Sequence, residues 1–165
     1  MLQYQSLTLE HTPLVKEYLD RYPRESCDYS LANLFTWGKI YNNQFCVHED
    51  KLIIVNPLYQ YVCFPLGEEI SPEFLADIVI QSRATFPDAE LILVPEDYLL
   101  THPGLHRYFE VEDNRSWADY IHSIDRLVEL KGKKLAKKKN LISQFIRTYP
   151  DYHVLPIYPS HKEEI

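Results

Sequence analysis

In the middle of the chain, some strand-like runs follow one another directly, and others are separated by helical patterns. Residues 44–55 (QFCVHEDKLIIV) predict two strands around a short turn near Asp50, and residues 59–67 (YQYVCFPLG) predict a third. Residues 90–95 (ELILVP) are almost wholly apolar, which is typical of a strand covered on both faces. Hairpins mixed with helical crossovers favour an α/β (α+β) fold, with a mixed, partly antiparallel sheet flanked by helices.

Helix signals lie between and after these runs. Thr12 with Pro13, Ser30, and Ser71 with Pro72 each supply an N-cap signal at the start of an amphipathic pattern. The predicted helices cover residues 12–21, 30–41, 72–86, 96–102, 123–130 and 133–149. Further strands are predicted at residues 2–7, 108–113, 119–123 and 152–158, where apolar and polar residues alternate.

The order of these elements resembles the acyltransferase fold of the GNAT superfamily. Acetyl-coenzyme A binders of that superfamily carry a glycine-rich turn, Q/RxxGxG/A, whose backbone amides hold the pyrophosphate at a helix start. The four glycines, Gly38, Gly67, Gly104 and Gly132, lie too far apart to form this turn. We therefore expect neither acetyl-coenzyme A nor another cofactor.

The composition and the N-terminal sequence both indicate a cytoplasmic protein. The chain of 165 residues is 45% apolar and 25% charged, as expected of a soluble globular domain. No apolar run approaches the roughly 20 residues of a membrane span. The first residues, MLQYQSLTLEH, lack the basic front and apolar centre of a signal peptide.

The cysteines offer little catalytic or metal-binding signal. Cys27, Cys46 and Cys63 show neither CxxC nor the paired Cys/His spacing of a zinc site, so no metal is expected. Cys46 and His48 would share one face of a strand, but no third group that could orient them is evident. The sequence therefore identifies no catalytic residue.

The charges are strongly segregated along the chain. Residues 1–130 hold 9 Lys/Arg against 21 Asp/Glu, a net charge of −12, whereas residues 131–165 hold 8 against 3, a net charge of +5. Residues 131–147, which we call the basic segment, contain seven basic residues and no acidic one. Such segregation indicates an interaction surface.

Within a helix over residues 133–149, Lys138 lies inside an apolar arc about 100° wide. The arc is formed by Leu135, Ile142, Phe145, Ile146 and Tyr149. The commoner interpretation is that Lys138 extends its ammonium to water. The alternative is a cleft in which Lys138 meets a ligand phosphate or the carboxylate of Asp119 or Asp125, because an unpaired buried ammonium costs several kcal/mol.

Nucleic acid is a second possible partner for the basic segment. The surrounding charge of −12 would repel a polyanion, and no RNP-type aromatic motif for base stacking is present. High-affinity binding by this chain alone is therefore not expected. The 13 tyrosines are spread along the chain and are expected to pack against the sheet.

Three stretches carry a family resemblance: residues 26–41 (SCDYSLANLFTWGKIY), 64–67 (FPLG) and 119–145 (DYIHSIDRLVELKGKKLAKKKNLISQF). They resemble the bacterial family named for the phosphatidylglycerol lysyltransferase C-terminal domain, whose members read DYIYxxEDLxxLxGKKxHKKRNHxxxF in the last stretch. The motif matches at Lys133, Lys134, Lys137, Lys138 and Asn140. The sequence departs from it at Ala136 and Leu141, where histidine is usual, and at Lys139, where arginine is usual.

The resemblance implies a transferase-like protein similar in fold to the Fem-type peptidoglycan aminoacyltransferases, which have two GNAT-like domains and use aminoacyl-tRNA. It implies a first GNAT-like domain at 1–130, a bridging helix at 131–150 and the start of a second domain at 151–165. The implied ligand-binding residues, for tRNA or another phosphate-bearing ligand, are Lys133, Lys134, Lys137, Lys138, Lys139 and Asn140.

Family members are about twice as long as this chain, and their acceptor pocket and most catalytic groups are expected in the second half. We therefore expect these 165 residues to be inactive alone. The alternative is a non-enzymatic module that self-associates through surfaces a second domain would cover, among them Val154, Leu155 and Ile157.

Overall fold

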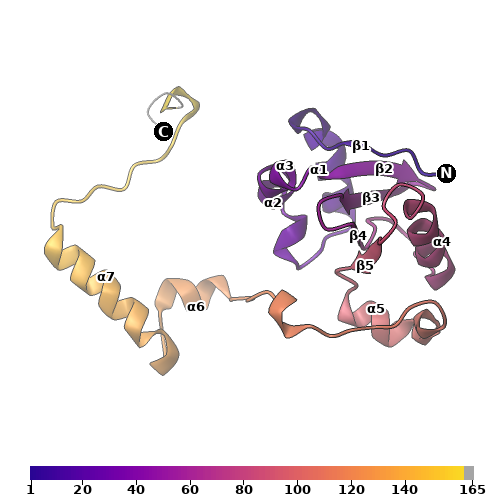
Figure 1. The fold of residues 1–165 in the computed structure, drawn as a ribbon. Coiled ribbons are helices and arrows are strands. Elements are labelled where there is room, and N and C mark those ends of the chain that lie inside the picture. Colours follow the sequence, from indigo (N-terminus) through magenta and orange to yellow (C-terminus); the bar gives the residue numbers. More distant parts are fainter. Residues whose placement is uncertain (162–165) are drawn as a thin grey trace. The chain divides into compact units, whose positions relative to one another are not determined.

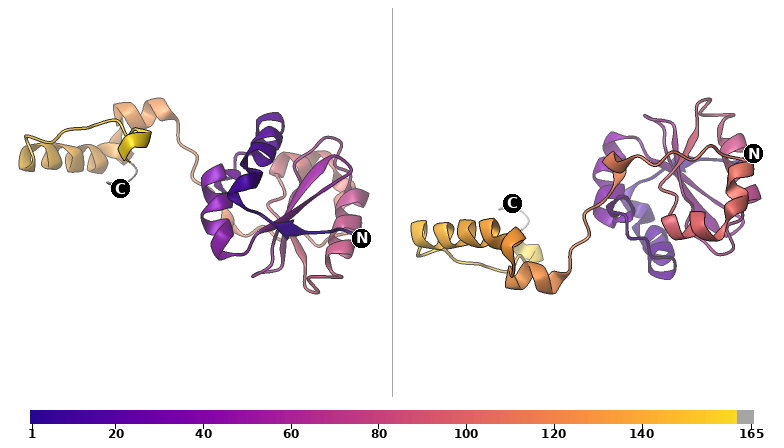
Figure 2. Two further views of the ribbon diagram at one scale, coloured as in Figure 1. Left: turned by 90° about the horizontal axis from the view of Figure 1, so that it is seen from above. Right: turned by 90° about the horizontal axis from the view of Figure 1, so that it is seen from below.

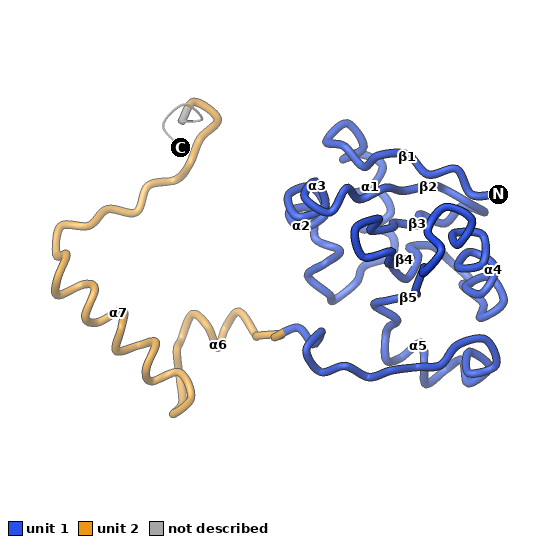
Figure 3. The backbone as a smooth tube through the Cα atoms, in the orientation of Figure 1, with its two compact units in different colours: residues 1–119 blue, residues 120–165 orange. Residues whose placement is uncertain are grey.

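The structure, a computed structural model, describes residues 1–161. The chain divides into two compact units, unit 1 (Met1–Asp119) and unit 2 (Tyr120–Ile165), which Figure 3 shows in different colours.

Unit 1 is built around a sheet whose strands follow the order β1-β2-β3-β4-β5 (Figure 1). The strands are β1 (Gln5–Ser6), β2 (Gln44–His48), β3 (Lys51–Asn56), β4 (Tyr61–Cys63) and β5 (Glu90–Ile92). Neighbours from β1 to β4 pair antiparallel, and β4 pairs parallel with β5. The predicted mixed, partly antiparallel sheet is confirmed.

Five short helices accompany the sheet, together with single 3-10 turns. The α-helices of unit 1 are α1 (Thr12–Arg21), α2 (Leu31–Phe35), α3 (Trp37–Ile40), α4 (Pro72–Ser82) and α5 (Glu96–Thr101). The 3-10 helices are η1 (Leu9–His11), η2 (Cys27–Tyr29), η3 (Pro103–Arg107) and η4 (Arg115–Trp117). Figure 2 shows α1 to α3 on one side of the sheet and α4 on the other.

Local capping chemistry explains where the main helices start. The Ser30 and Ser71 side chains accept the backbone N–H groups of Asn33 and Phe74, as predicted for N-caps. Thr12 differs from the prediction because it is the first helical residue, and its hydroxyl donates to the Leu9 carbonyl. These helices therefore start within a few residues of the predicted positions.

The helix predicted over residues 30–41 is divided into α2 and α3 at Thr36. The Thr36 hydroxyl donates to the Ala32 carbonyl at 2.6 Å, a contact that competes with regular helix geometry. As a result, Trp37 begins a separate short helix.

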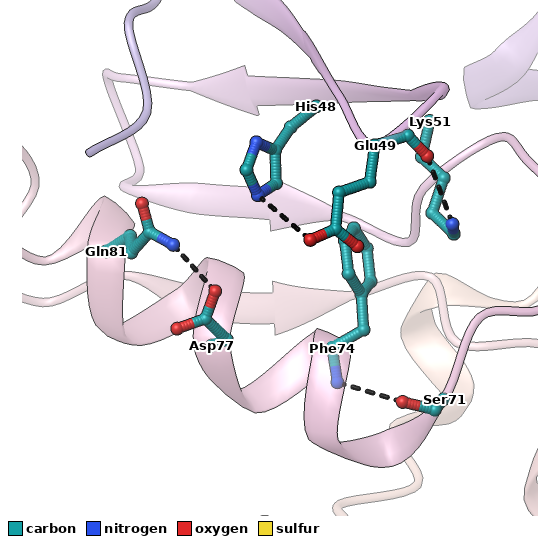
Figure 4. Close-up of polar contacts among 7 residues, drawn as sticks. All are labelled: His48, Glu49, Lys51, Ser71, Phe74, Asp77 and Gln81. Atoms are coloured by element: carbon teal, nitrogen blue, oxygen red, sulfur yellow. Dashed lines mark hydrogen bonds and ion pairs between the residues drawn. The ribbon is translucent and has the colours of Figure 1, made fainter.

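The β2–β3 hairpin turns at Glu49 and Asp50, both of which have positive φ (47° and 56°). Two consecutive residues of this kind form the tight turn that matches strand twist. Figure 4 shows the hairpin end against α4, where the Phe74 ring lies 6.2 Å from the His48 ring and 4.9 Å from the Lys51 ammonium. The turn therefore packs against the N-terminal part of α4, which covers one face of the sheet.

The core has two parts, one on each face of the sheet. Ile53 and Val55 of β3 pack in the cluster that includes α4, whereas Leu52 and Ile54 pack in the cluster that includes α1 and α2. Alternation of side chains along a strand produces this division. Central strand β3 is thus covered on both faces.

Three of the predicted strands are absent from the described residues. Residues 108–113 and 119–123 are irregular, and residues 152–158 form no ladder with another strand. Alternation of apolar and polar residues is compatible with a strand, but a strand also needs a neighbouring backbone to pair with. No such neighbour lies beside these segments in the part of the chain that the structure describes.

Asp119, at the end of unit 1, is held by a residue far away in sequence. Its Oδ2 accepts the Cys27 backbone N–H at 2.8 Å, and its Oδ1 lies 3.1 Å from the Cys27 thiol, which donates to it. The hydrogen bonds lower the pKa of Asp119 and raise the pKa of the Cys27 thiol. Asp119, one of the two carboxylates considered as a partner for Lys138, is thus engaged by Cys27 within unit 1.

Two isoleucines of α4 form a matched pair for testing the core. Ile78 is fully buried, whereas Ile80 is 65% exposed on the same helix. We expect Ile78→Ala to lower the free energy of unfolding by about 2–5 kcal/mol, because it removes buried methyl groups and leaves a cavity. Ile80→Ala should change it by about 0.5 kcal/mol or less, measured by urea denaturation. Equal losses for the two variants would contradict the described packing of α4.

The Asp119 contact predicts a change in the reactivity of Cys27, an exposed thiol that differs from the buried Cys46 and half-buried Cys63. Asp119→Asn removes the charge that raises the Cys27 pKa, so more thiolate is present at pH 8 and alkylation by iodoacetamide should be faster. Asp113→Asn is the control, because Asp113 lies in the same segment and makes no such contact. An unchanged Cys27 rate, followed by mass spectrometry, would refute the contact.

The same contact has a defined pH dependence. Because the pKa of Asp119 is lowered in the folded state, its stabilising effect is fully present above the ordinary carboxyl pKa. The effect is lost only as the pH falls through the lowered value. The contact therefore persists throughout the neutral range.

Candidate functional site

The basic segment includes almost all of the longest helix of unit 2. The elements of unit 2 are α6 (Ile124–Glu129), η5 (Lys133–Leu135), α7 (Ala136–Thr148) and η6 (Pro159–His161). Leu130 and Gly132, between α6 and η5, have positive φ values of 49° and 94°. The reversal between the two helices therefore depends on left-handed backbone, which glycine adopts without strain at position 132.

The predicted basic helix is confirmed, with a 3-10 first turn. All of the predicted ligand-binding side chains are exposed, and we call them the basic cluster: Lys133, Lys134, Lys137, Lys138, Lys139 and Asn140. They occupy η5 and the first five residues of α7. The cluster is therefore concentrated at one end of the helix rather than spread along it.

Lys138 does not have the carboxylate partner that was considered for it. Within unit 2, no ion pair joins the lysines of the basic cluster to an acidic side chain, although the neighbouring Lys131 pairs with Glu129 at 2.9 Å. Asp119 is engaged by Cys27 instead. In unit 2, Lys138 is exposed rather than buried.

The start of α7 lacks the groups that ordinarily stabilise a helix N-terminus. No side chain caps it, and its first turn contains no acidic residue. Because η5 leads directly into α7, the N–H groups of Leu135 and Ala136 are already bonded to the carbonyls of Gly132 and Lys133, and the free N–H groups lie at the start of η5. Their partial positive charge repels the nearby lysines, at a cost of roughly 0.3–1 kcal/mol each. The cluster is thus at the end of the helix where cations stabilise it least and where an anion would be stabilised most.

The far half of α7 presents an apolar face that is exposed in unit 2. It is formed by Leu141, Ile142, Phe145, Ile146 and Tyr149, and we call it the apolar face of α7. The Phe145 ring also contacts the rings of Tyr149 and Tyr152, each at a centroid distance of 5.2 Å. Lys138 lies one turn before Leu141 and Ile142 on this same side of the helix.

The structure gives no support to a cysteine nucleophile at Cys46. Cys46 is buried in the core, and burial raises its thiol pKa to about 11. A thiol with this pKa is protonated at neutral pH and is a poor nucleophile. The Cys46–His48 pair is therefore a consequence of strand alternation.

Neither a metal-ligand cluster nor a membrane-spanning helix is present in the described residues. No group of three or more His, Cys, Asp or Glu side chains there is arranged to hold a metal ion. No helix in that part of the chain has both the length and the apolar character needed to cross a membrane.

Sequence reasoning located the cluster but missed the uncapped start of α7. The signal was present: neither Leu135 nor Ala136 is a capping residue, and residues 131–147 contain no acidic side chain. Ordinary helices use Ser, Thr, Asp or Asn before the first turn and acidic residues within it. The missing cap and the missing acidic residues therefore point to the same segment that the lysines identify.

Comparison with known proteins gives a family match and a similar solved structure. The family model described as "Phosphatidylglycerol lysyltransferase, C-terminal" matches residues 19–165, and no curated protein matches the chain. A solved structure of a conserved protein of unknown function from Bacteroides thetaiotaomicron is similar, with a TM-score of 0.83 and 27% identity. The similarity covers 99% of this chain and 56% of that one, so the chain spans little more than half of that protein.

The family match covers most of the chain, including the lysine-rich motif on which the resemblance rested. The chain therefore belongs to the phosphatidylglycerol lysyltransferase C-terminal-domain family.

Proposed function

We propose that this chain is the N-terminal, GNAT-like half of an aminoacyltransferase-like protein, and that its basic cluster binds a phosphate-bearing ligand such as tRNA. The observation that carries the proposal is the position of five lysines at the uncapped start of α7 without carboxylate partners within unit 2. The family match and the 56% coverage of a longer relative support the first part.

The chemistry of the cluster suits phosphate. The first-turn N–H groups can donate to phosphate oxygens, and the lysine ammonium groups add charge-assisted hydrogen bonds. Lys139 stands where the family motif usually has arginine. Lysine binds phosphate as a point charge, whereas arginine can form two parallel hydrogen bonds to it. Binding should therefore depend strongly on salt and weakly on nucleotide sequence.

Transfer chemistry by these residues alone is not part of the proposal. The described thiols are either engaged, like Cys27 with Asp119, or protonated by burial, like Cys46. The cluster itself consists of exposed ammonium groups and an amide, which bind anions but do not form an acid–base pair. We propose a binding role for this chain and place catalysis in the complete protein.

The binding role predicts a specific dependence on charge and position. Lys138→Gln with Lys139→Gln should weaken tRNA binding about tenfold in 100 mM salt and reduce the logarithmic salt slope by about 1.5, because two phosphate contacts are lost. Fluorescence anisotropy with labelled tRNA between 50 and 300 mM salt measures both quantities.

The control variant carries the same charge change elsewhere: Lys16→Gln with Lys39→Gln, both exposed residues of unit 1. It should leave affinity nearly unchanged. Nucleotides and anionic lipid vesicles, titrated in parallel, distinguish tRNA from other phosphate sources. Binding that responds equally to the two double variants would refute the assignment of the basic cluster.

A second candidate function rests on the apolar face of α7 and on the exposed Val154, Leu155 and Ile157. Exposed apolar surface of this kind marks protein interaction sites. In this case the chain is a non-enzymatic module that self-associates through these residues.

Self-association predicts a dimer fraction that rises with protein concentration in sedimentation velocity. Ile142→Asp with Phe145→Asp should abolish the rise, because burying a carboxylate in an apolar interface costs several kcal/mol. The matched control is Leu100→Asp, at an exposed apolar residue of unit 1. A monomer at all concentrations, from micromolar to millimolar, would eliminate this candidate.

A further inference from the structure

Unit 1 carries a continuous row of five aromatic rings that no part of the proposed function uses. The row runs through Trp37, Tyr41, Tyr59, Tyr61 and Trp117, with successive centroid distances of 6.0, 5.8, 5.8 and 5.5 Å. These residues come from α3, the loop after it, the turn before β4, β4 itself and η4. Three separate segments of unit 1 thus contribute to one surface, which we call the aromatic row.

Much of the aromatic row is open to solvent. Trp37 is 54% exposed, Tyr59 56% and Trp117 50%, while Tyr41 and Tyr61 are half-buried. The expectation that the tyrosines pack against the sheet holds for Tyr29 and Tyr98, which are buried, but not for Tyr59. Large rings exposed together are uncommon in soluble domains unless they contact a partner.

The backbone beneath the row is held in place by hydrogen bonds. The Asn56 side chain accepts the Tyr59 backbone N–H at 3.2 Å, and Tyr61 pairs within the sheet with Asn56 and Glu90. The Asn43 N–H donates to the Gly38 carbonyl at 2.7 Å, which secures the loop after α3. A row positioned in this way loses little conformational freedom when a ligand binds.

Acidic and basic residues both lie near the aromatic row, in a unit whose net charge is negative. Glu90 is the parallel-sheet neighbour of Tyr61, and Asp88 is held beside the row by Gln60, whose side chain bonds both its carboxylate and its backbone N–H. Lys39 and Arg115 are the basic residues close in sequence to the two end rings. Unit 1 as a whole holds 8 Lys/Arg against 19 Asp/Glu, a net charge of −11.

The net negative charge of unit 1 determines which class of ligand the aromatic row attracts. A single-stranded nucleic acid could stack on successive rings, but the negative field of unit 1 repels its phosphates. Cations are attracted both by the carboxylates and by the faces of Trp and Tyr rings. In an extended peptide, alternate side chains lie on one face about 6.6–6.8 Å apart, close to the ring-to-ring steps of the row.

We propose that the aromatic row binds an extended, lysine- or arginine-rich segment of a partner protein, with its cationic side chains lying against the exposed rings of Trp37, Tyr59 and Trp117. Charge complementarity between this segment and unit 1 is what favours it over other occupants. The site is separate from the basic cluster, which belongs to unit 2 and attracts the opposite charge. The proposal therefore stands whether or not the basic cluster binds phosphate.

Tryptophan fluorescence reports directly on this surface, because the two tryptophans of the chain, Trp37 and Trp117, are both members of the row. The full chain is titrated with the peptide Lys-Ser-Lys-Ser-Lys-Ser-Lys, with its glutamate counterpart, with oligo(dT) and with maltohexaose. A saturable change in emission with the lysine peptide alone, weakened by added salt, is the expected result. No change with the lysine peptide, or an equal change with another probe, would overturn the proposal.

Variants then assign the binding to the row. Tyr59→Ala should weaken binding of the lysine peptide about fivefold, since one cation–π contact is lost. Tyr108→Ala, at an exposed tyrosine of unit 1 outside the row, should have little effect. Asp88→Asn with Glu90→Gln should weaken binding and flatten its salt dependence. If Tyr59→Ala and Tyr108→Ala have equal effects while circular dichroism shows both folded, the row is not the site.

Discussion

The repulsion between the lysines of the basic cluster and the positive end of α7 is the interaction on which this account depends. Helix stability alone would favour acidic residues in this first turn and basic residues in the last. The sequence places five lysines from position 133 to 139 and only Arg147 in the last turn. An anion bound at this end of the helix would offset the repulsion, and within unit 2 no acidic side chain pairs with these lysines.

The two halves of α7 have different requirements. The first turn needs negative charge, while the apolar face of α7 needs removal from water. Lys138 belongs to both, since it lies on the side of Leu141 and Ile142 but close to the helix start. An anionic ligand at the first turn and a protein surface over the later turns would satisfy both requirements at once. The two candidate functions of the basic segment are therefore compatible in physical terms.

Local signals in the sequence predicted much of the fold. Ser71 and Pro72 specify the start of α4 through groups that lie within three residues of each other, and the β2–β3 hairpin needs only its two-residue turn. Strand pairing beyond hairpins was less predictable, because residues 152–158 have the alternation of a strand without a partner to pair with. The apolar–polar pattern is a property of one segment, whereas a strand in a sheet also needs a second segment to pair with.

The contacts of the candidate sites were predictable to different degrees. The lysines of the basic cluster are adjacent in sequence and were found directly. The Asp119–Cys27 contact joins residues 92 positions apart, and no periodicity reports such a pairing. The aromatic row is similar, because its rings come from segments between residues 37 and 117 that only the folded sheet brings together. Composition revealed the tyrosines but not their arrangement.

The central claim is that the uncapped start of α7 and its lysines form one anion site. Backbone amide chemical shifts of the full chain, followed by NMR during a titration with inorganic pyrophosphate, test this claim most directly. The account predicts saturable shifts concentrated at residues 133–140, with those of residues 144–148 much smaller. Shifts that are absent from residues 133–140, or that are spread evenly over all lysines of the chain, would contradict it.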